Sequence, residues 1–228
     1  MTPTDQMPSD LLKTSFSRRA VMRLMTMLGV SAALPGALLS HGAFAQDGKG
    51  DAAVFVGNFA QRGINDILAA TIPNTEKQKR FRDMFVDYFD LPGIGRFVLT
   101  RYFRAASPEE QQKFTQLFED VVVYTWSRRF SEYNGQTLKV VSQQPDGNDG
   151  IIVKSTIVGR TGSSFNVDWR LRKRPEGFKV LDVIVGGVSM AITYRQDYGT
   201  VISQTGSFAG LLAQMEKQVE DLKKQQGA

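Results

Sequence analysis

Cysteine is absent from this sequence of 228 residues, and histidine occurs only once, at position 41. The absence of cysteine excludes disulfide bonds, thiolate metal ligands, cysteine nucleophiles and a lipid anchor attached to a cysteine. His41 lies in a segment that we expect to be cleaved, so the remaining chain has no imidazole. It therefore lacks the base of a Ser-His-Asp or Cys-His mechanism, and it is poorly suited to bind zinc.

The sequence also carries little excess charge. Its 28 Lys+Arg and 23 Asp+Glu residues give a formal net charge of +5. This value falls to +3 without residues 1–45, which hold four of the basic and two of the acidic side chains. So small an excess argues against a dedicated nucleic-acid-binding protein. A hydrophobic content of 42% is ordinary for a globular protein, and the length predicts one domain or at most two.

Residues 1–45 have the organisation of an export signal. A basic segment around the Arg18-Arg19 pair precedes an uncharged apolar stretch from Leu24 to Ser40, and Ala43-Phe44-Ala45 supplies a cleavage site. The apolar stretch is short for a membrane span, although an N-terminal anchor helix is the alternative interpretation. The arginine pair is similar to a twin-arginine signal, but Val21 stands where such signals usually have Phe, so the Sec route stays open. We expect residues 46–228 to form a single soluble domain in the periplasm.

Helical periodicity dominates the first half of this domain. Apolar residues fall on one face over residues 51–70, again from Thr75 to Pro92, and again from Ser107 to about residue 133. Thr75 with Gln78, and Ser107 with Glu110, have the spacing of capping boxes, which predicts that helices begin at these two serine or threonine residues. A short apolar segment lies between the second and third helices.

The period changes to two after residue 136. Four strands are predicted over residues 137–143, 151–158, 164–174 and 178–185, joined by tight turns, and one face of the third strand is apolar while the other is polar. Helical signals return over residues 189–203 and 207–225. The fold class is therefore α+β, with about four helices, a four-stranded twisted antiparallel meander covered by helices on one face, and two C-terminal helices.

The most unusual feature of the composition is its fifteen phenylalanines. Many of them recur at helical spacing, and such a stripe usually packs into a core. The alternative is a hydrophobic ligand cavity between the helices and a curved sheet, because so many bulky apolar side chains can also line a pocket.

Four segments have a recognisable order and spacing: RYFRAASPEEQQKF (101–114), YNGQ (133–136), GFKVLDV (177–183) and GVSMAITYR (187–195). Together they resemble the signature of the MlaC (toluene-tolerance) family of periplasmic phospholipid-binding proteins, over about residues 52 to 215. Phe103 and Phe178 stand where this family commonly has Trp, and both keep a large apolar ring.

This resemblance implies the function of the chain. Members of the family are carriers, not enzymes, in an Mla-type ABC transport system. They shuttle phospholipid between an outer-membrane lipoprotein–porin complex and an inner-membrane ABC transporter complex with an MCE-domain subunit. The implied protein is a monomer without a cofactor, whose cargo is phospholipid held in a cavity between the helices and a twisted sheet.

Physical chemistry explains why such a carrier needs a pocket but no catalytic residue. Each buried CH₂ is worth about 0.8 kcal/mol, so two acyl chains of roughly 15 methylenes each represent about 24 kcal/mol against water. A pocket as apolar as a bilayer makes transfer nearly neutral. We expect the lipid to contact inward-facing residues of the sheet, the helices and the closing segment, namely Val153, Val167, Trp169, Val183, Phe85, Phe89, Ile94, Phe97, Val98, Phe118, Val121, Val188 and Ile192.

Asp182 has two interpretations. Strand alternation places it on the same face as Phe178 and Val180, where a carboxylate is expected to be a buried anchor bonded to Tyr194, Arg195 or the amides of the turn before the next helix. The alternative is a catalytic acid in a small α+β-cup isomerase, acting with Tyr194 or Tyr198.

Three further alternatives remain open from the sequence. Arg170, Arg172, Lys173 and Arg174, on or near the polar face of the third strand, form either a solvated face or a docking patch for acidic partners or anionic head groups. The cargo could be another lipid, such as a hopanoid. The chain could also be an adaptor protein with a solid core.

Overall fold

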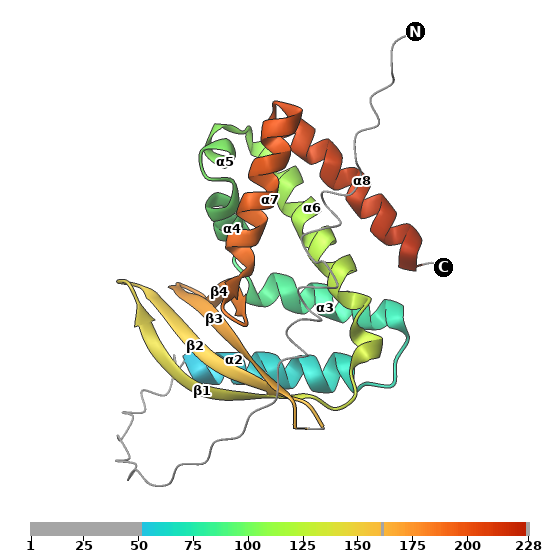
Figure 1. The fold of residues 1–228 in the computed structure, drawn as a ribbon, viewed down its shortest axis with the longest axis vertical. Helices are drawn as coiled ribbons and strands as arrows, with labels where there is room; N and C mark the ends of the chain where they lie inside the picture. Colours follow the sequence, from blue (N-terminus) through green and yellow to red (C-terminus); the bar gives the residue numbers. More distant parts are fainter. Residues whose placement is uncertain (1–51, 161, 227–228) are drawn as a thin grey trace.

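The computed structural model describes residues 52–160 and 162–226. The predicted export signal, residues 1–45, lies outside the described residues. The chain begins with helices, continues as an antiparallel sheet and ends with two helices, which confirms the α+β class (Figure 1). The first helical half consists of α2 (Ala52–Gly63), the π-helical turn η1 (Ile64–Leu68), α3 (Asn74–Tyr88), α4 (Leu91–Leu99), α5 (Arg101–Ala105), α6 (Pro108–Ser127) and the 3₁₀ turn η2 (Phe130–Glu132).

The sheet has five strands, in the order β1-β2-β3-β4-β5, and neighbouring strands are antiparallel. Four were expected, and they correspond to β1 (Thr137–Asp146), β2 (Gly150–Val158), β3 (Ser164–Arg174) and β4 (Gly177–Val185). The prediction of four strands was wrong because the chain turns back at Gly186 and Gly187, both at positive φ, and adds the two-residue strand β5 (Val188–Ser189). Helices α7 (Met190–Thr205) and α8 (Phe208–Gln226) follow.

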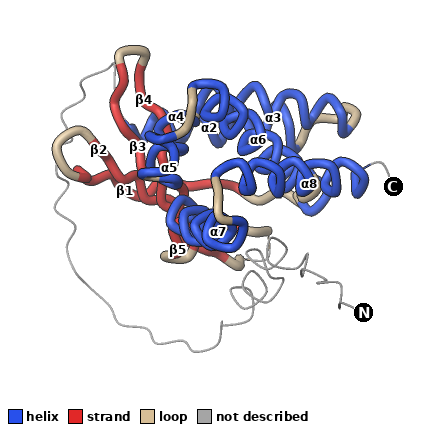
Figure 2. The backbone as a smooth tube through the Cα atoms, turned by 90° about the horizontal axis from the view of Figure 1, so that it is seen from above, coloured by secondary structure: helices blue, strands red, loops and turns tan. Residues whose placement is uncertain are grey.

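The elements form two bodies that meet beside β4. In the first, the sheet is strongly curved and α2 lies along its inner face (Figure 1). In the second, α4, α6, α7 and α8 pack together beyond the β4 side of the sheet, and α3 lies between this group and α2. The view from above shows the same division, with the strands on one side and the helical group on the other (Figure 2). A parallel bridge between Phe89 and Val180 and a hydrogen bond from the Asp90 amide to the Val180 carbonyl join the two bodies.

The first residues of the helices show which of the predicted capping signals are present in the structure. The capping box at Ser107 is confirmed, since its hydroxyl accepts from the Glu110 amide and the Glu110 carboxylate accepts from the Ser107 amide. The box predicted at Thr75 is wrong, because α3 begins one residue earlier, after Pro73 and without a side-chain cap. The expected short apolar segment is α4, which Asp90 caps by accepting a hydrogen bond from the Gly93 amide at 2.8 Å. Helix α6 ends at Ser127, earlier than expected.

Candidate functional site

The inner face of the sheet and helix α2 bury one apolar cluster, which we name the sheet cluster. It forms because alternate residues of β2, β3 and β4 point to the concave side, where the apolar stripe of α2 covers them. Its buried members are Ala52, Val56, Val153, Val167, Trp169, Leu171, Phe178 and Val180. Within it, the Trp169 indole donates to the Ser155 hydroxyl at 3.0 Å, and this hydroxyl donates to the Val167 carbonyl, so the buried polar atoms have partners.

A second apolar cluster, the helical cluster, fills the space between α3, α4, α6, α7 and α8. Its buried members are Phe85, Leu91, Ile94, Val98, Leu99, Phe103, Phe114, Leu117, Phe118, Val121, Val122, Val123, Ala191, Tyr194, Tyr198, Val201, Ile202, Leu211, Leu212, Met215 and Val219. Side chains at three-and-four spacing supply most of them, as the periodicity predicted.

Aromatic rings connect the two clusters. Phe89, at the end of α3, is half-buried and packs against both. Its ring centroid lies 4.5 Å from that of Phe85 in the helical cluster and 6.0 Å from that of Phe59 on α2. The Phe59 ring in turn lies 5.2 Å from the indole of Trp169 on β3. The interior is therefore continuous from the sheet to the helices through four rings, Trp169, Phe59, Phe89 and Phe85.

The structure places ten of the thirteen predicted lipid-contacting residues in or against these clusters. Val153, Val167 and Trp169 belong to the sheet cluster, and Val183 packs against it. Phe85, Ile94, Val98, Phe118 and Val121 belong to the helical cluster, and Phe89 touches both.

Three of the predicted residues do not face inward. Phe97, Val188 and Ile192 are 40%, 55% and 45% exposed. Helix α4 is short and has one charged residue, Arg96, and the exposed side of the helix holds Arg96 and Phe97 while Val98 and Leu99 turn inward. Val188 lies on the two-residue strand β5 at the edge of the sheet, and its side chain is exposed.

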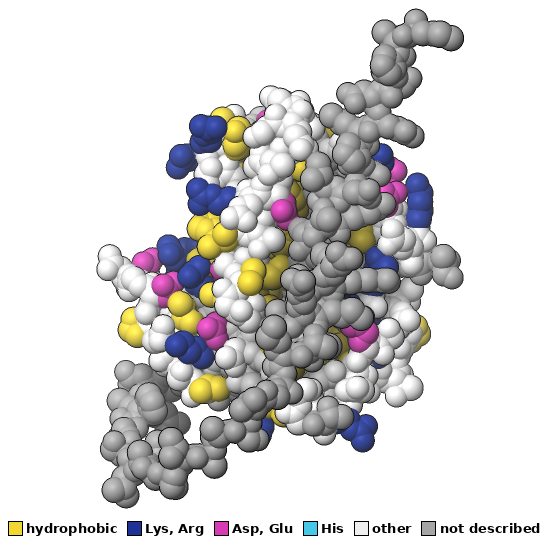
Figure 3. Space-filling view, in the orientation of Figure 1, with side chains coloured by type: hydrophobic (Ala, Val, Ile, Leu, Met, Phe, Trp, Pro, Cys, Tyr) yellow, Lys and Arg dark blue, Asp and Glu magenta, His cyan; other side chains and the backbone are white. Residues whose placement is uncertain are grey.

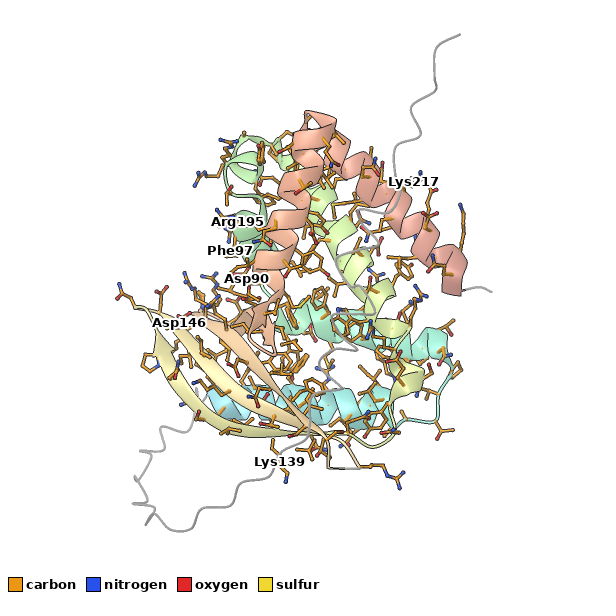
Figure 4. All side chains as sticks on the ribbon, viewed as in Figure 1. Asp90, Phe97, Lys139, Asp146, Arg195 and Lys217 are labelled. Carbon is orange, nitrogen blue, oxygen red and sulfur yellow. The ribbon has the colours of Figure 1, made fainter. Side chains whose placement is uncertain are left out.

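The structure brings Phe97 and Ile192 together in an open groove instead. This groove has a volume of about 770 Å³ and runs between α4 and α5 on one side and α7 on the other, and its lining consists of Phe97, Tyr102, Ile192, Arg195, Gln196, Gly199, Thr200 and Ser203. Figure 4 shows Phe97 and Arg195 next to each other on α4 and α7. Sequence reasoning missed the polar half of the groove. Its signal was the stripe of small and polar residues at three-and-four spacing from Gln196 to Ser203.

Asp182 is buried, as expected, but on the other face of the sheet. Arg170 pairs with Asp182 and Leu171 pairs with Val180, so Leu181 is an extra residue that forms a β-bulge. The bulge turns Asp182 away from the sheet cluster. Its carboxylate accepts hydrogen bonds from the Ser189 hydroxyl at 2.6 Å, the Ala191 amide at 2.9 Å and Arg170 Nη1 at 3.2 Å. The expected turn supplies the Ser189 hydroxyl rather than an amide, and Arg170 and the Ala191 amide were not among the expected partners.

The Asp182 carboxylate is held by groups on β3, β5 and α7. Asp182 Oδ2 accepts from Arg170 and the Ser189 hydroxyl, and Oδ1 accepts from the Ala191 amide. Burial raises the pKa of the Tyr194 and Tyr198 hydroxyls well above the ordinary value, so both hydroxyls are protonated at neutral pH.

Three of the four basic residues of β3 lie within ion-pair distance of a carboxylate. Arg170 bridges Asp146 and Asp182, and the Arg174 guanidinium binds Asp90. Burial opposes the ionisation of Asp90, but the hydrogen bonds from Arg174 and the Gly93 amide outweigh it and hold the pKa of this carboxyl below its ordinary value. Arg170 and Arg174, two of the four basic residues predicted on or near this face, therefore connect different elements of the fold. Arg172 Nη1 lies 3.9 Å from Asp149 Oδ2.

Two negative findings apply to the part of the chain that the structure describes. Residues 52–160 and 162–226 contain no helix that is both long and apolar enough to cross a bilayer. They also contain no group of three or more side chains of the types that usually hold a metal ion.

The fold and this interior define a class, namely α+β proteins in which helices pack on one face of a curved antiparallel sheet around an aromatic interior. Residues 64–217 match the family model described as MlaC protein, and the chain belongs to the MlaC family. This match confirms the resemblance found in the sequence.

Individual relatives agree with this family. The toluene tolerance protein Ttg2D of Pseudomonas putida is 26% identical over 156 residues, which are 64% of this chain and 73% of that protein. The intermembrane phospholipid transport system binding protein MlaC of Haemophilus influenzae is 22% identical over 129 residues, 55% of this chain and 60% of that protein. The chain thus spans less than two thirds of the length of the Haemophilus relative. A phospholipid-binding protein from Ralstonia solanacearum, solved in complex with a phospholipid, shares the fold with a TM-score of 0.65 at 21% identity, over 73% of this chain and 98% of that one.

Proposed function

We propose that this protein is a periplasmic phospholipid carrier that shuttles lipid between an outer-membrane complex and an inner-membrane Mla-type transporter complex. Membership of the MlaC family supports this proposal, as do the phospholipid-related names of the relatives. The observation that carries it is the chain of rings from Trp169 through Phe59 and Phe89 to Phe85, which joins two apolar clusters on separate bodies.

Acyl chains can enter between such clusters at little cost. Separating the rings exposes apolar surface, and an acyl chain that fills the gap buries the same surface again, so the net change per unit area is small. Polar contacts between the sheet and the helices gather at β4 and the adjoining end of β3. They include Asp90 with Arg174, the Asp90 amide with the Val180 carbonyl, Lys179 with the Asp87 carbonyl, and Asp182 with the start of α7. We infer that the cargo lies along the ring chain, against the inward-facing residues of both clusters.

A lipid transfer assay tests this function. Donor vesicles that contain labelled phospholipid are mixed with unlabelled acceptor vesicles, and the protein is expected to accelerate transfer in proportion to its concentration. Phe89→Ala removes a ring that lies between the clusters. Phe208→Ala is the matched control, because Phe208 is also half-buried but packs on the helical cluster alone, beside Phe114.

Phe89→Ala is expected to lower transfer strongly, and Phe208→Ala to lower it little, at comparable melting temperatures. Transfer at the uncatalysed rate with wild-type protein would contradict the carrier function. Efficient transfer of a polycyclic lipid such as a hopanoid, without transfer of phospholipid, would support the carrier function but identify a different cargo.

A further inference from the structure

The groove between α4, α5 and α7 carries an arginine on each of its two aromatic rings. The guanidinium carbon of Arg195 lies 5.6 Å from the centroid of the Phe97 ring. That of Arg101 lies 4.9 Å from the centroid of the Tyr102 ring, and its Nη2 donates to the Tyr102 hydroxyl at 3.0 Å. A ring face holds a guanidinium in place and leaves most of its N–H groups free for a ligand, and a planar fork of this kind matches the oxygens of a phosphate.

Positive charge predominates around this groove. Helices α4, α5 and α7 contain four arginines, Arg96, Arg101, Arg104 and Arg195, and Asp197 is their one acidic residue. Within the described residues, none of these arginines forms a salt bridge with a carboxylate. The contrast with β3 is clear, since Arg170 and Arg174 are paired there.

Exposed apolar side chains lie among these arginines. Phe97 and Ile192 line the groove and are 40% and 45% exposed. The space-filling view shows hydrophobic and basic side chains gathered on the same face, over α4, α5 and α7 (Figure 3). Basic side chains around an apolar centre form the pattern of a surface that binds the interface of a bilayer, where phosphates lie above hydrocarbon.

We propose that this groove is a docking surface for membranes that expose anionic phospholipids. The arginines contact lipid phosphates, while Phe97 and Ile192 reach the boundary between head groups and acyl chains. The inference rests on the proposed carrier function in one respect, because a lipid carrier must approach a membrane. The exposed Phe97 and Ile192 among the guanidinium groups favour a lipid surface over an acidic protein segment, because a bilayer interface offers hydrocarbon next to its phosphates.

Vesicle flotation tests the docking surface. Wild-type protein is mixed with vesicles of phosphatidylcholine alone and with vesicles that also contain phosphatidylglycerol. Arg101→Gln with Arg195→Gln removes both ring-bound guanidinium groups. Lys139→Gln with Lys217→Gln is the matched control, because it removes the same charge from β1 and α8, away from the groove (Figure 4).

The wild type is expected to float with the phosphatidylglycerol vesicles only, and to be released by salt. The arginine double variant is expected to bind about 30-fold more weakly, since each basic residue near an anionic surface contributes about 1 kcal/mol. The lysine double variant should bind nearly as well as the wild type. Phe97→Ser should weaken binding to the same vesicles without changing its dependence on salt.

Four results would overturn the proposal. The first two are equal binding to both vesicle types and equal losses of binding in the two double variants. The third is release by millimolar inorganic phosphate, which would indicate a site for free phosphate. The fourth is an arginine double variant that loses cargo lipid while it still binds vesicles. Failure of the carrier function has a different signature. If the wild type contains no lipid, but floats with vesicles and loses this binding in the arginine double variant, the docking surface is supported and the carrier function is rejected.

Discussion

Replacing Asp182 by Ala is expected to lower stability without removing a reaction. The substitution deletes the acceptor of three hydrogen bonds, at 2.6, 2.9 and 3.2 Å. It leaves the buried amide of Ala191 without this partner. Arg170 loses one carboxylate but keeps Asp146, which accepts from its Nε at 2.9 Å.

The magnitude follows from these contacts. Removing one partner of a buried charge pair typically costs about 3–5 kcal/mol. Because Arg170 retains a second carboxylate, we expect the lower end, about 3 kcal/mol. A domain of this size loses about 2–4 °C in melting temperature per kcal/mol, so the expected decrease is roughly 6–12 °C.

Thermal unfolding followed by circular dichroism measures the effect. Asp146→Ala is the control, since Asp146 also pairs with Arg170 but its side chain is 32% exposed, and a pair of this exposure contributes about 0–1 kcal/mol. Below its melting temperature, Asp182→Ala should retain the lipid content of the wild type. A variant that melts like the wild type but no longer carries lipid would refute the structural role and make Asp182 a functional residue.

Three further predictions address the interior, the acid stability and the N-terminus. Val98→Trp and Val121→Trp should give folded protein with less co-purified lipid, because the new ring occupies space that we assign to an acyl chain. Unfolding of both variants, or an unchanged lipid content, would contradict this placement of the lipid. Asp90 has a lowered pKa, so its stabilisation is present above its ordinary pKa of 3.8 and disappears as the pH falls through its value in the folded protein. Asp90→Asn should therefore lower the urea midpoint at pH 7, and the difference from wild type should shrink in acid; a constant difference would speak against the Asp90–Arg174 contact. N-terminal sequencing of exported protein should begin near Gln46, and an intact Met1 on periplasmic material would exclude cleavage.

Elements whose local signals agree could be predicted closely. Strand β3 alternates along its whole length, and its observed bounds, Ser164–Arg174, are those predicted. The Ser107 capping box likewise marks the start of α6. In both cases the determinants lie within the element itself, so no tertiary contact is needed to specify them.

The rest depends on long-range contacts that a sequence pattern does not show. The bulge at Leu181 was missed because strict alternation was assumed along β4, which placed the Asp182 carboxylate on the apolar face; the charge of Asp182 next to Leu181 was the signal of the shift. Leu181 packs against the helical cluster while Val180 and Val183 pack with the sheet cluster. The exposure of Phe97 was missed because Arg96, the one charged residue of the short helix α4, was not taken as the mark of its exposed side. The sequence pattern identified ten residues that lie in or against the apolar clusters, but the division of these residues between two clusters is visible only in the structure.

The most direct test of the carrier is the chemical identity of what the folded protein holds. Protein isolated from the periplasm without detergent is extracted with organic solvent, and the extract is analysed by mass spectrometry alongside that of an unrelated periplasmic protein purified in the same way. We expect phospholipid at close to a fixed molar ratio to the protein, and less of it in Phe89→Ala than in Phe208→Ala. An extract with no lipid above that of the unrelated protein, from wild type that is fully folded, would contradict the central claim.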